Sequence, residues 1–121
     1  MIEKKNIMKH RSFLFAVRII KAYQYLSEIK KEFVLSKQLL RSGTAVGALI
    51  RESQKAERKA DFIHKLSIAQ KECDETIYWL ELLKETSYLN ENEFKSICDE
   101  AEELLKIIRS SILTTKGKLN S

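Results

Sequence analysis

The chain contains no proline, and its only glycines are Gly43, Gly47 and Gly117. Sheets and sandwiches connect their strands through turns that call for such residues about every 8–12 positions. A β-protein is therefore excluded, as are collagen-like chains and Pro/Gly-rich disordered chains. With 121 residues, 44% of them hydrophobic, the chain is long and apolar enough for one domain with a buried core. The sequence predicts a single all-α domain over residues 1–121.

Apolar residues recur with the helical period in four segments. The short connections between them predict an up-down-up-down antiparallel four-helix bundle. We expect Ser36 to cap the second helix, and Asn90 and Glu93 to form a capping box at the start of the fourth. The basic arm 1–11 and the polar tail 114–121 are expected to be poorly ordered. The expected helices are 12–30, 36–55, 60–85 and one that begins near residue 90.

The first helix carries two apolar stripes on roughly opposite sides. One contains Phe13, Ala16, Val17, Ile20 and Tyr23, and the other contains Phe15, Ile19, Ala22, Leu26 and Ile29. A helix that packs on one core needs only one such stripe. This helix is therefore either central in its own bundle or partly buried against another subunit. On the second interpretation, Phe15, Ile19 and Leu26 are candidate subunit contacts.

The second helix places Gly43 and Gly47 one turn apart. This spacing permits a neighbouring helix to approach closely, and ordinary tight packing is the simpler interpretation.

Residues with enzyme chemistry are scarce. Neither His10 nor His64 belongs to an H-E-x-x-H or E-x-x-H motif. Ser42 and Ser53 have no base within helical reach, and no glycine-rich loop is placed to hold a phosphate. We therefore predict a protein that is not an enzyme and has no metal site or cofactor.

The two cysteines, Cys73 and Cys98, lie on apolar stripes and do not form a CxxC pair, so we expect buried free thiols. Arg18 and Lys21 interrupt the apolar stretch near the N-terminus, which argues against a signal peptide. No run approaches the roughly 18 apolar residues that span a bilayer. We expect a cytoplasmic protein without membrane contact.

Charge is divided unevenly along the chain. Residues 1–60 include 14 basic and 5 acidic residues, whereas residues 61–121 include 8 basic and 12 acidic ones. This asymmetry predicts an anionic partner for the first half, or contact between the basic half of one subunit and the acidic half of another. A solvated surface without a partner is the alternative.

Basic residues of the second helix and its exit fall within an arc of roughly 100° if the helix continues. They are Lys37, Arg41, Arg51, Lys55, Arg58 and Lys59. Arg11 and Arg18 cluster in a similar way on one side of the first helix. Such a surface could neutralise phosphates without reading a base sequence, and a solvated helix face is the alternative.

The third helix carries a complementary patch. Glu72, Glu75 and Trp79 lie within about 60° of one another, away from the core stripe. A tryptophan framed by carboxylates is a reasonable interface anchor, although it could also shield the edge of the bundle. On the interface interpretation, Arg41 would pair with Glu72 or Glu75 of a neighbouring subunit. Unlike patches on one protomer favour a heterologous, ring-closing assembly.

Three stretches carry a resemblance to a known family: QLLRSGTAVGALIRE at 38–52, KADFIHKLSIA at 59–69 and KECDETIYWLELL at 71–83. They resemble the "four helix bundle protein" family, whose members include proteins encoded by intervening sequences within bacterial 23S rRNA genes. The accessory variability determinant of diversity-generating retroelements shares this fold. Leu49 stands where the family often has Asn, and Ser53 where it often has Ala. The positions that match the family pattern are Arg41, Ser42, Gly47, Glu52, Asp61, Phe62, Glu72, Glu75, Trp79 and Leu80.

The resemblance implies a homopentameric ring with a positively charged surface, and the retroelement relative binds nucleic acid and a reverse transcriptase. Two hypotheses follow. In the first, the chain is a homo-oligomeric protein that binds RNA or DNA through its basic residues. In the second, its charged faces join subunits or dock a protein partner such as a reverse transcriptase.

Overall fold

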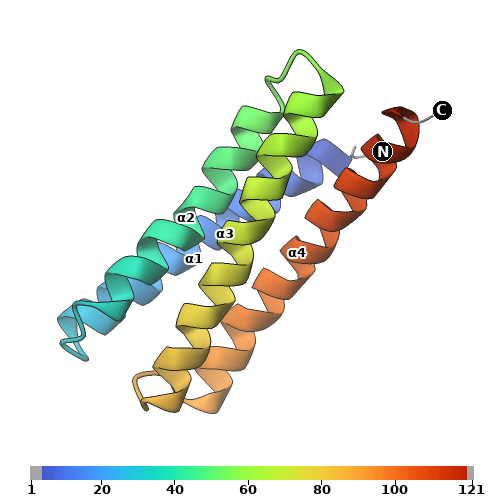
Figure 1. The fold of residues 1–121 in the computed structure, drawn as a ribbon. Helices are drawn as coiled ribbons and strands as arrows, with labels where there is room; N and C mark the ends of the chain where they lie inside the picture. Colours follow the sequence, from blue (N-terminus) through green and yellow to red (C-terminus); the bar gives the residue numbers. More distant parts are fainter. Residues whose placement is uncertain (1–3, 120–121) are drawn as a thin grey trace.

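The computed structural model describes residues 4–119, and this part of the chain forms four α-helices and no strand (Figure 1). Each helix packs against the next, and the last returns to the first, so α1 lies diagonally opposite α3. This arrangement confirms the predicted all-α four-helix bundle. The helices are α1 (Lys4–Glu28), α2 (Leu35–Ser53), α3 (Lys59–Glu85) and α4 (Glu91–Leu119).

Both outer helices are longer than the sequence predicted. Residues 4–11 and 114–119 are helical, whereas residues 1–3 and 120–121 lie outside the described part of the chain. Nothing in 4–11 breaks a helix, and the fully buried Met8 anchors this segment in the core. The Gln54 side chain also donates a 2.6 Å hydrogen bond to the Lys5 carbonyl, which ties the first turn of α1 to the end of α2.

The start of α2 is stabilised by Glu32, and the prediction that Ser36 is its cap was wrong. Backbone N–H groups of Val34, Leu35 and Ser36 donate to the buried Glu32 carboxylate at 2.7–3.0 Å. The Ser36 hydroxyl donates instead to the Glu32 carbonyl at 2.7 Å. Burial by itself raises the pKa of Glu32, but these backbone hydrogen bonds outweigh burial and lower that pKa below its usual value.

The start of α4 follows the predicted capping box. The Glu93 N–H donates to the Asn90 side-chain oxygen, and the Asn90 N–H donates to the Glu93 carboxylate, both at 2.8 Å. Two N–H groups that the helix itself cannot satisfy thereby gain partners.

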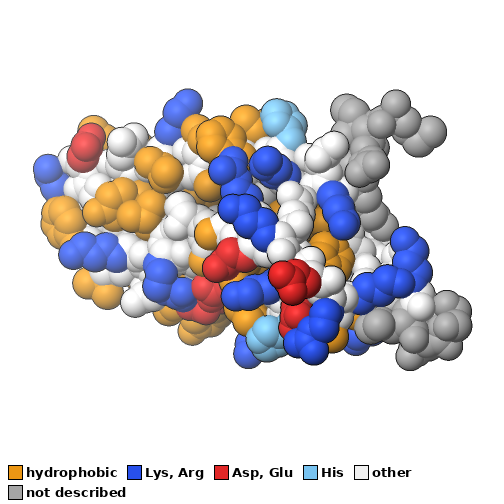
Figure 2. Space-filling view, turned by 90° about the horizontal axis from the view of Figure 1, so that it is seen from above, with side chains coloured by type: hydrophobic (Ala, Val, Ile, Leu, Met, Phe, Trp, Pro, Cys, Tyr) orange, Lys and Arg blue, Asp and Glu red, His pale blue; other side chains and the backbone are white. Residues whose placement is uncertain are grey.

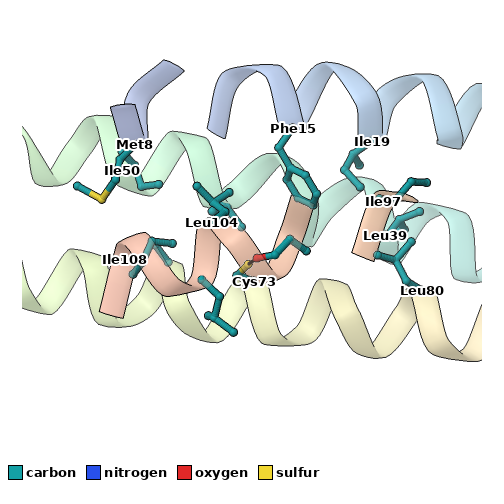
Figure 3. Close-up of a cluster of buried hydrophobic side chains, with 14 of the residues drawn as sticks. Met8, Phe15, Ile19, Leu39, Ile50, Cys73, Leu80, Ile97, Leu104 and Ile108 are labelled. Carbon is teal, nitrogen blue, oxygen red and sulfur yellow. Dashed lines mark hydrogen bonds between the residues drawn. The ribbon is translucent and has the colours of Figure 1, made fainter. Parts of the chain in front are cut away.

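The apolar stripe of α1 that contains Phe15 and Ile19 packs into the core, whereas the stripe that contains Phe13 and Ile20 lies at the surface. Phe15, Ile19 and Leu26 are buried in the bundle with the inner faces of the other helices, so they are not available to a second subunit (Figure 3). This corrects their assignment as subunit contacts. The exposed side of α1 carries Phe13 and Ile20 instead.

Gly43 and Gly47 set the distance between α1 and α2. A Cβ at Gly43 would lie 2.7 Å from an Ile19 side-chain carbon, and one at Gly47 would lie 3.3 Å from the Ser12 carbonyl oxygen. The close approach predicted from their spacing is therefore present, and it serves ordinary packing within the bundle.

The two cysteines are buried free thiols, as predicted. Burial raises the pKa of Cys73 to about 12 and that of Cys98 to about 11, so both stay protonated near neutral pH. The Cys73 thiol donates to the Ala101 carbonyl at 3.3 Å, which links α3 to α4.

Candidate nucleic-acid interface

The structure divides the predicted basic arc into two groups. Because α2 ends at Ser53, Lys55 lies in the following turn and Arg58 and Lys59 lie at the start of α3. Lys37 occupies the first turns of α2, about 20 Å along the helix axis from Arg51. The assumption that the helix continues past Ser53 was wrong, and the six residues do not form one continuous surface.

Half of the eight predicted phosphate-binding residues are paired with carboxylates of their own chain. Lys37, Arg51, Lys55 and Lys59, in contrast, have no acidic partner among residues 4–119. A paired arginine must release its carboxylate before it can bind a phosphate, so the unpaired residues are the stronger candidates. The pairs are Arg11–Glu103, Arg18–Glu100, Arg41–Glu72, Arg41–Glu75 and Arg58–Asp61.

One end of the bundle collects basic side chains. Here the first turn of α1, the α2–α3 turn and the last turns of α4 meet, and Figure 2 shows Lys and Arg side chains gathered toward this end. Of the acidic residues here, Glu57 is exposed in the α2–α3 turn, Glu52 lies 3.9 Å from Lys65, and Asp61 pairs with Arg58. We call this region the basic end, and six of its exposed basic residues are Lys5, Lys9, Arg51, Lys55, Lys59 and Lys116.

Sequence reasoning missed three of these residues. It placed Lys5 and Lys9 in a poorly ordered arm and Lys116 in a fraying tail. In the structure all three are helical: Lys5 lines one pocket with Lys59, Lys9 lines another with Arg51, and Lys116 lies in the last turn of α4. The missed signal was the buried Met8, an apolar residue that continues the core stripe of α1 one turn beyond the predicted start.

The acidic-aromatic patch of α3 binds α2 of the same chain. The Arg41 guanidinium donates to Glu72 at 2.8 Å and also to Glu75, and the Trp79 indole N–H donates to Glu75 at 3.2 Å. Burial by itself raises the pKa of Glu75, but its hydrogen bonds with Arg41 and Trp79 lower that pKa overall. Arg41 therefore joins α2 to α3, in place of the predicted pairing with a neighbouring subunit.

Exposed apolar side chains gather at the opposite end of the bundle, in the turn between α1 and α2. Ile29, Phe33 and Val34 are 68%, 53% and 73% exposed. On the outer face of α3, Tyr78 is 54% exposed, whereas its neighbour Trp79 is partly buried against the core. The sequence pattern placed Ile29 on an apolar stripe of the first helix, but the chain turns away there and leaves Ile29 exposed. Phe33, Val34 and Tyr78 lie outside the predicted stripes and were not singled out.

The two histidines of the chain lie apart from each other. Within residues 4–119, no three His, Cys, Asp or Glu side chains are placed to hold a metal ion. His10 and His64 are both exposed and lie on diagonally opposite helices. In the described part of the chain, no helix combines the length and the apolar character needed to cross a membrane.

The fold and the basic end define a small four-helix-bundle protein with a basic surface at one end. The chain belongs to the 23S rRNA-intervening sequence protein family, which matches residues 4–110. Among solved structures, it is similar to a protein of unknown function from the S23 ribosomal protein family of Bacteroides thetaiotaomicron VPI-5482. The two chains are 50% identical with a TM-score of 0.90, and the match covers 91% of this chain and 98% of that one. No curated protein matches the chain.

Proposed function

We propose that this protein is a non-enzymatic, homo-oligomeric protein that binds nucleic acid through its basic end. The observation that carries the proposal is the group Arg51, Lys55 and Lys59, which has no acidic partner in the described chain and lies beside Lys5 and Lys9. The family, named after intervening sequences of 23S rRNA, makes a structured RNA the first ligand to test.

The chemistry of this surface favours electrostatic binding. Lys and Arg side chains that neutralise phosphates release condensed counterions, so the affinity falls steeply as salt rises. The basic end lies on helix termini and a turn, and no helix there is free to enter a groove and read base edges. We therefore expect binding with little preference for base sequence.

A charge-reversal pair tests this proposal. Arg51→Glu with Lys55→Glu should weaken binding of a fluorescein-labelled RNA hairpin by at least tenfold at low salt. The plot of log affinity against log salt should also become shallower, because fewer counterions are released. Fluorescence anisotropy across a salt series measures both quantities.

The matched control carries the same reversals at the far end of the bundle. Lys30→Glu with Lys31→Glu also changes two exposed basic residues, and it should leave affinity and salt slope close to those of the wild type. The proposal fails if the wild type does not bind RNA or DNA at low salt, or if both double variants weaken binding equally.

A second candidate function, an interaction scaffold, is favoured by the exposed apolar turn at the far end. Ile29, Phe33 and Val34 leave apolar area to bury against another copy of the chain or a protein partner such as a reverse transcriptase. The family resemblance makes five copies the expected assembly. If the protein is such a scaffold, its basic end would bind the nucleic acid on which the partner acts.

Mass measurement by light scattering, with and without the RNA hairpin, separates the two functions. We expect the wild type to assemble without RNA, and Phe33→Ser with Val34→Ser to reduce the assembly to monomers. Arg51→Glu with Lys55→Glu should leave the mass unchanged. A wild type that is monomeric both with and without RNA would contradict the proposed assembly.

A further inference from the structure

A pocket of about 340 Å³ lies on the outer side of α1, beside α2, at the basic end. Its walls combine one aromatic ring with groups that donate hydrogen bonds or carry positive charge. They contain no carboxylate, so the pocket is complementary to an anion or an electron-rich group. The lining residues are Asn6, Lys9, His10, Phe13 and Arg51.

Phe13 occupies an unusual position for a large apolar residue. Its ring is 51% exposed, and the Arg51 guanidinium lies over it with 5.6 Å between the guanidinium carbon and the ring centre. Neither Arg51 nor Lys9 has an acidic partner among residues 4–119. The structure thus presents an aromatic ring with the Arg51 guanidinium over it, next to a lysine that has no acidic partner among residues 4–119.

This combination is the one that proteins use to hold single-stranded nucleic acid. Unpaired bases stack on aromatic rings and on guanidinium planes, while lysines and arginines neutralise the adjoining phosphates. Bases inside a duplex are already stacked on one another and cannot reach such a ring. The basic end alone would favour a duplex, which carries the higher charge density.

We propose that this pocket receives an unpaired nucleobase of a single-stranded nucleic acid, which stacks on Phe13 while Arg51 and Lys9 neutralise neighbouring phosphates. The inference rests on the proposed nucleic-acid binding and assigns its ligand class: a single strand or an unpaired loop. Stacking accepts every base, because each has a flat π-face, so the site adds affinity without adding sequence preference.

Three probes of equal length test the ligand class: a 12-nucleotide uridine RNA, its deoxyuridine counterpart and a 12-base-pair duplex. We expect both single strands to bind more tightly than the duplex. The difference between the RNA and DNA strands reports whether the 2′-hydroxyl contributes. Tighter binding of the duplex would overturn the inference, because charge alone explains that result.

Substitutions at Phe13 test the stacking contact. Phe13→Ala should weaken single-strand binding about tenfold without changing the salt slope, because stacking releases no counterion. Phe13→Leu should lose most of the same affinity although it keeps the apolar area, and Phe13→Tyr should retain it. Arg51→Gln should reduce both affinity and salt slope.

Tyr78→Ala is the matched control, because Tyr78 is an aromatic residue that is 54% exposed on α3 and does not line the pocket. It should leave single-strand binding unchanged, and circular dichroism should show that all variants stay helical. If Phe13→Ala binds as tightly as the wild type, the stacking site is rejected while the proposed function stands. If no probe binds the wild type, the proposed function itself fails.

Discussion

At the residue scale, Glu32 performs a task that helix-capping patterns assign to Ser, Thr, Asp or Asn. Its carboxylate reaches three N–H groups because Lys31 adopts a left-handed backbone conformation with φ of 57° and turns the chain back. Glycine is the residue most often found in this left-handed conformation, because it has no Cβ. A sequence pattern that relies on the usual capping residues therefore selects Ser36 and overlooks Glu32.

The role of Glu32 predicts a pH-dependent stability. Its pKa is lowered in the folded state, so the carboxylate stabilises the fold above its unfolded pKa of about 4.5. That contribution is lost as pH falls through the lowered folded value. Glu32→Gln should lower the free energy of unfolding by about 1–2 kcal/mol near pH 7, and the difference should shrink below about pH 4.

Urea unfolding followed by Trp79 fluorescence measures this difference at neutral and acidic pH. Glu28→Gln, an exposed carboxylate at the end of α1, is the control and should have little effect at either pH. A Glu32→Gln penalty of the same size under both conditions would argue against an ionised cap.

Gly43 and Gly117 give a matched pair of helical glycines. At Gly43 an added methyl group would press on Ile19, so Gly43→Ala should destabilise the fold by about 1–3 kcal/mol. At Gly117 nothing lies within 4 Å, and Gly117→Ala should be neutral or stabilise by up to about 1 kcal/mol. Thermal unfolding compares the two variants, and equal effects would contradict the close approach of α1 and α2.

At the scale of the helices, the two apolar stripes of α1 show what helical periodicity cannot predict, namely which stripe faces the core. Each stripe is apolar enough to face a core, and helical spacing alone does not choose between them. The choice depends on the neighbour, because Gly43 of α2 leaves room for Ile19 and Gly47 leaves room for Ser12, which both lie on the buried side of α1. The same limit applies to charge, since the helical pattern pairs Arg41 with Glu72 or Glu75 without deciding whether those carboxylates belong to the same chain or to a neighbour.

Arg41 should therefore matter more for helix packing than for nucleic-acid binding. Arg41→Gln removes two carboxylate contacts between α2 and α3 and should destabilise the fold by about 1 kcal/mol, since the guanidinium is half exposed. Lys55→Gln should have little effect on stability but should weaken RNA binding more than Arg41→Gln does. Urea unfolding and anisotropy on the same samples measure both effects, and a larger binding loss for Arg41→Gln would contradict this division of roles.

At the scale of the whole molecule, the bundle is closed less tightly on one side. The α1–α4 seam has the least extensive packing of the four neighbouring pairs, and a cavity of about 300 Å³ opens along it beside Ala22 and Ile97. The ion pairs of Arg11 and Arg18 cross this seam. Exposed ion pairs contribute little, so apolar packing limits how firmly α1 and α4 are joined.

A larger side chain at the seam should close it. Ala22→Leu adds about three carbon atoms beside the cavity and should stabilise the fold by about 1 kcal/mol. Ala69→Leu makes the same change at a fully buried position of α3 and should destabilise by about 1–3 kcal/mol. Chemical denaturation of the two variants checks the expectation, and destabilisation by Ala22→Leu would show that the seam has no room.

The sequence was sufficient for the fold class, the four helices and the inner faces of α3 and α4, because these depend on spacing within one helix. It was not sufficient for the candidate interface. The basic end is assembled from four helix termini and one turn, so Lys5, Lys9 and Lys116 come to the same end of the molecule as Arg51 only once the bundle has formed. For the same reason, the sequence did not indicate the partners of Arg11 and Arg18, and it placed the correct partners of Arg41, Glu72 and Glu75, on a neighbouring subunit.

Because α1, α4 and the α2–α3 turn meet at one end, the structure fixes how far each part of the molecule lies from a bound RNA. α3 alone spans about 40 Å, so a protomer whose basic end rests on RNA holds its α1–α2 turn roughly that far above the strand. A fluorophore or fused domain attached near either end of the chain would sit beside the RNA (Figure 1). The same label inserted at the α1–α2 turn would lie at the opposite end of the bundle, far from the RNA.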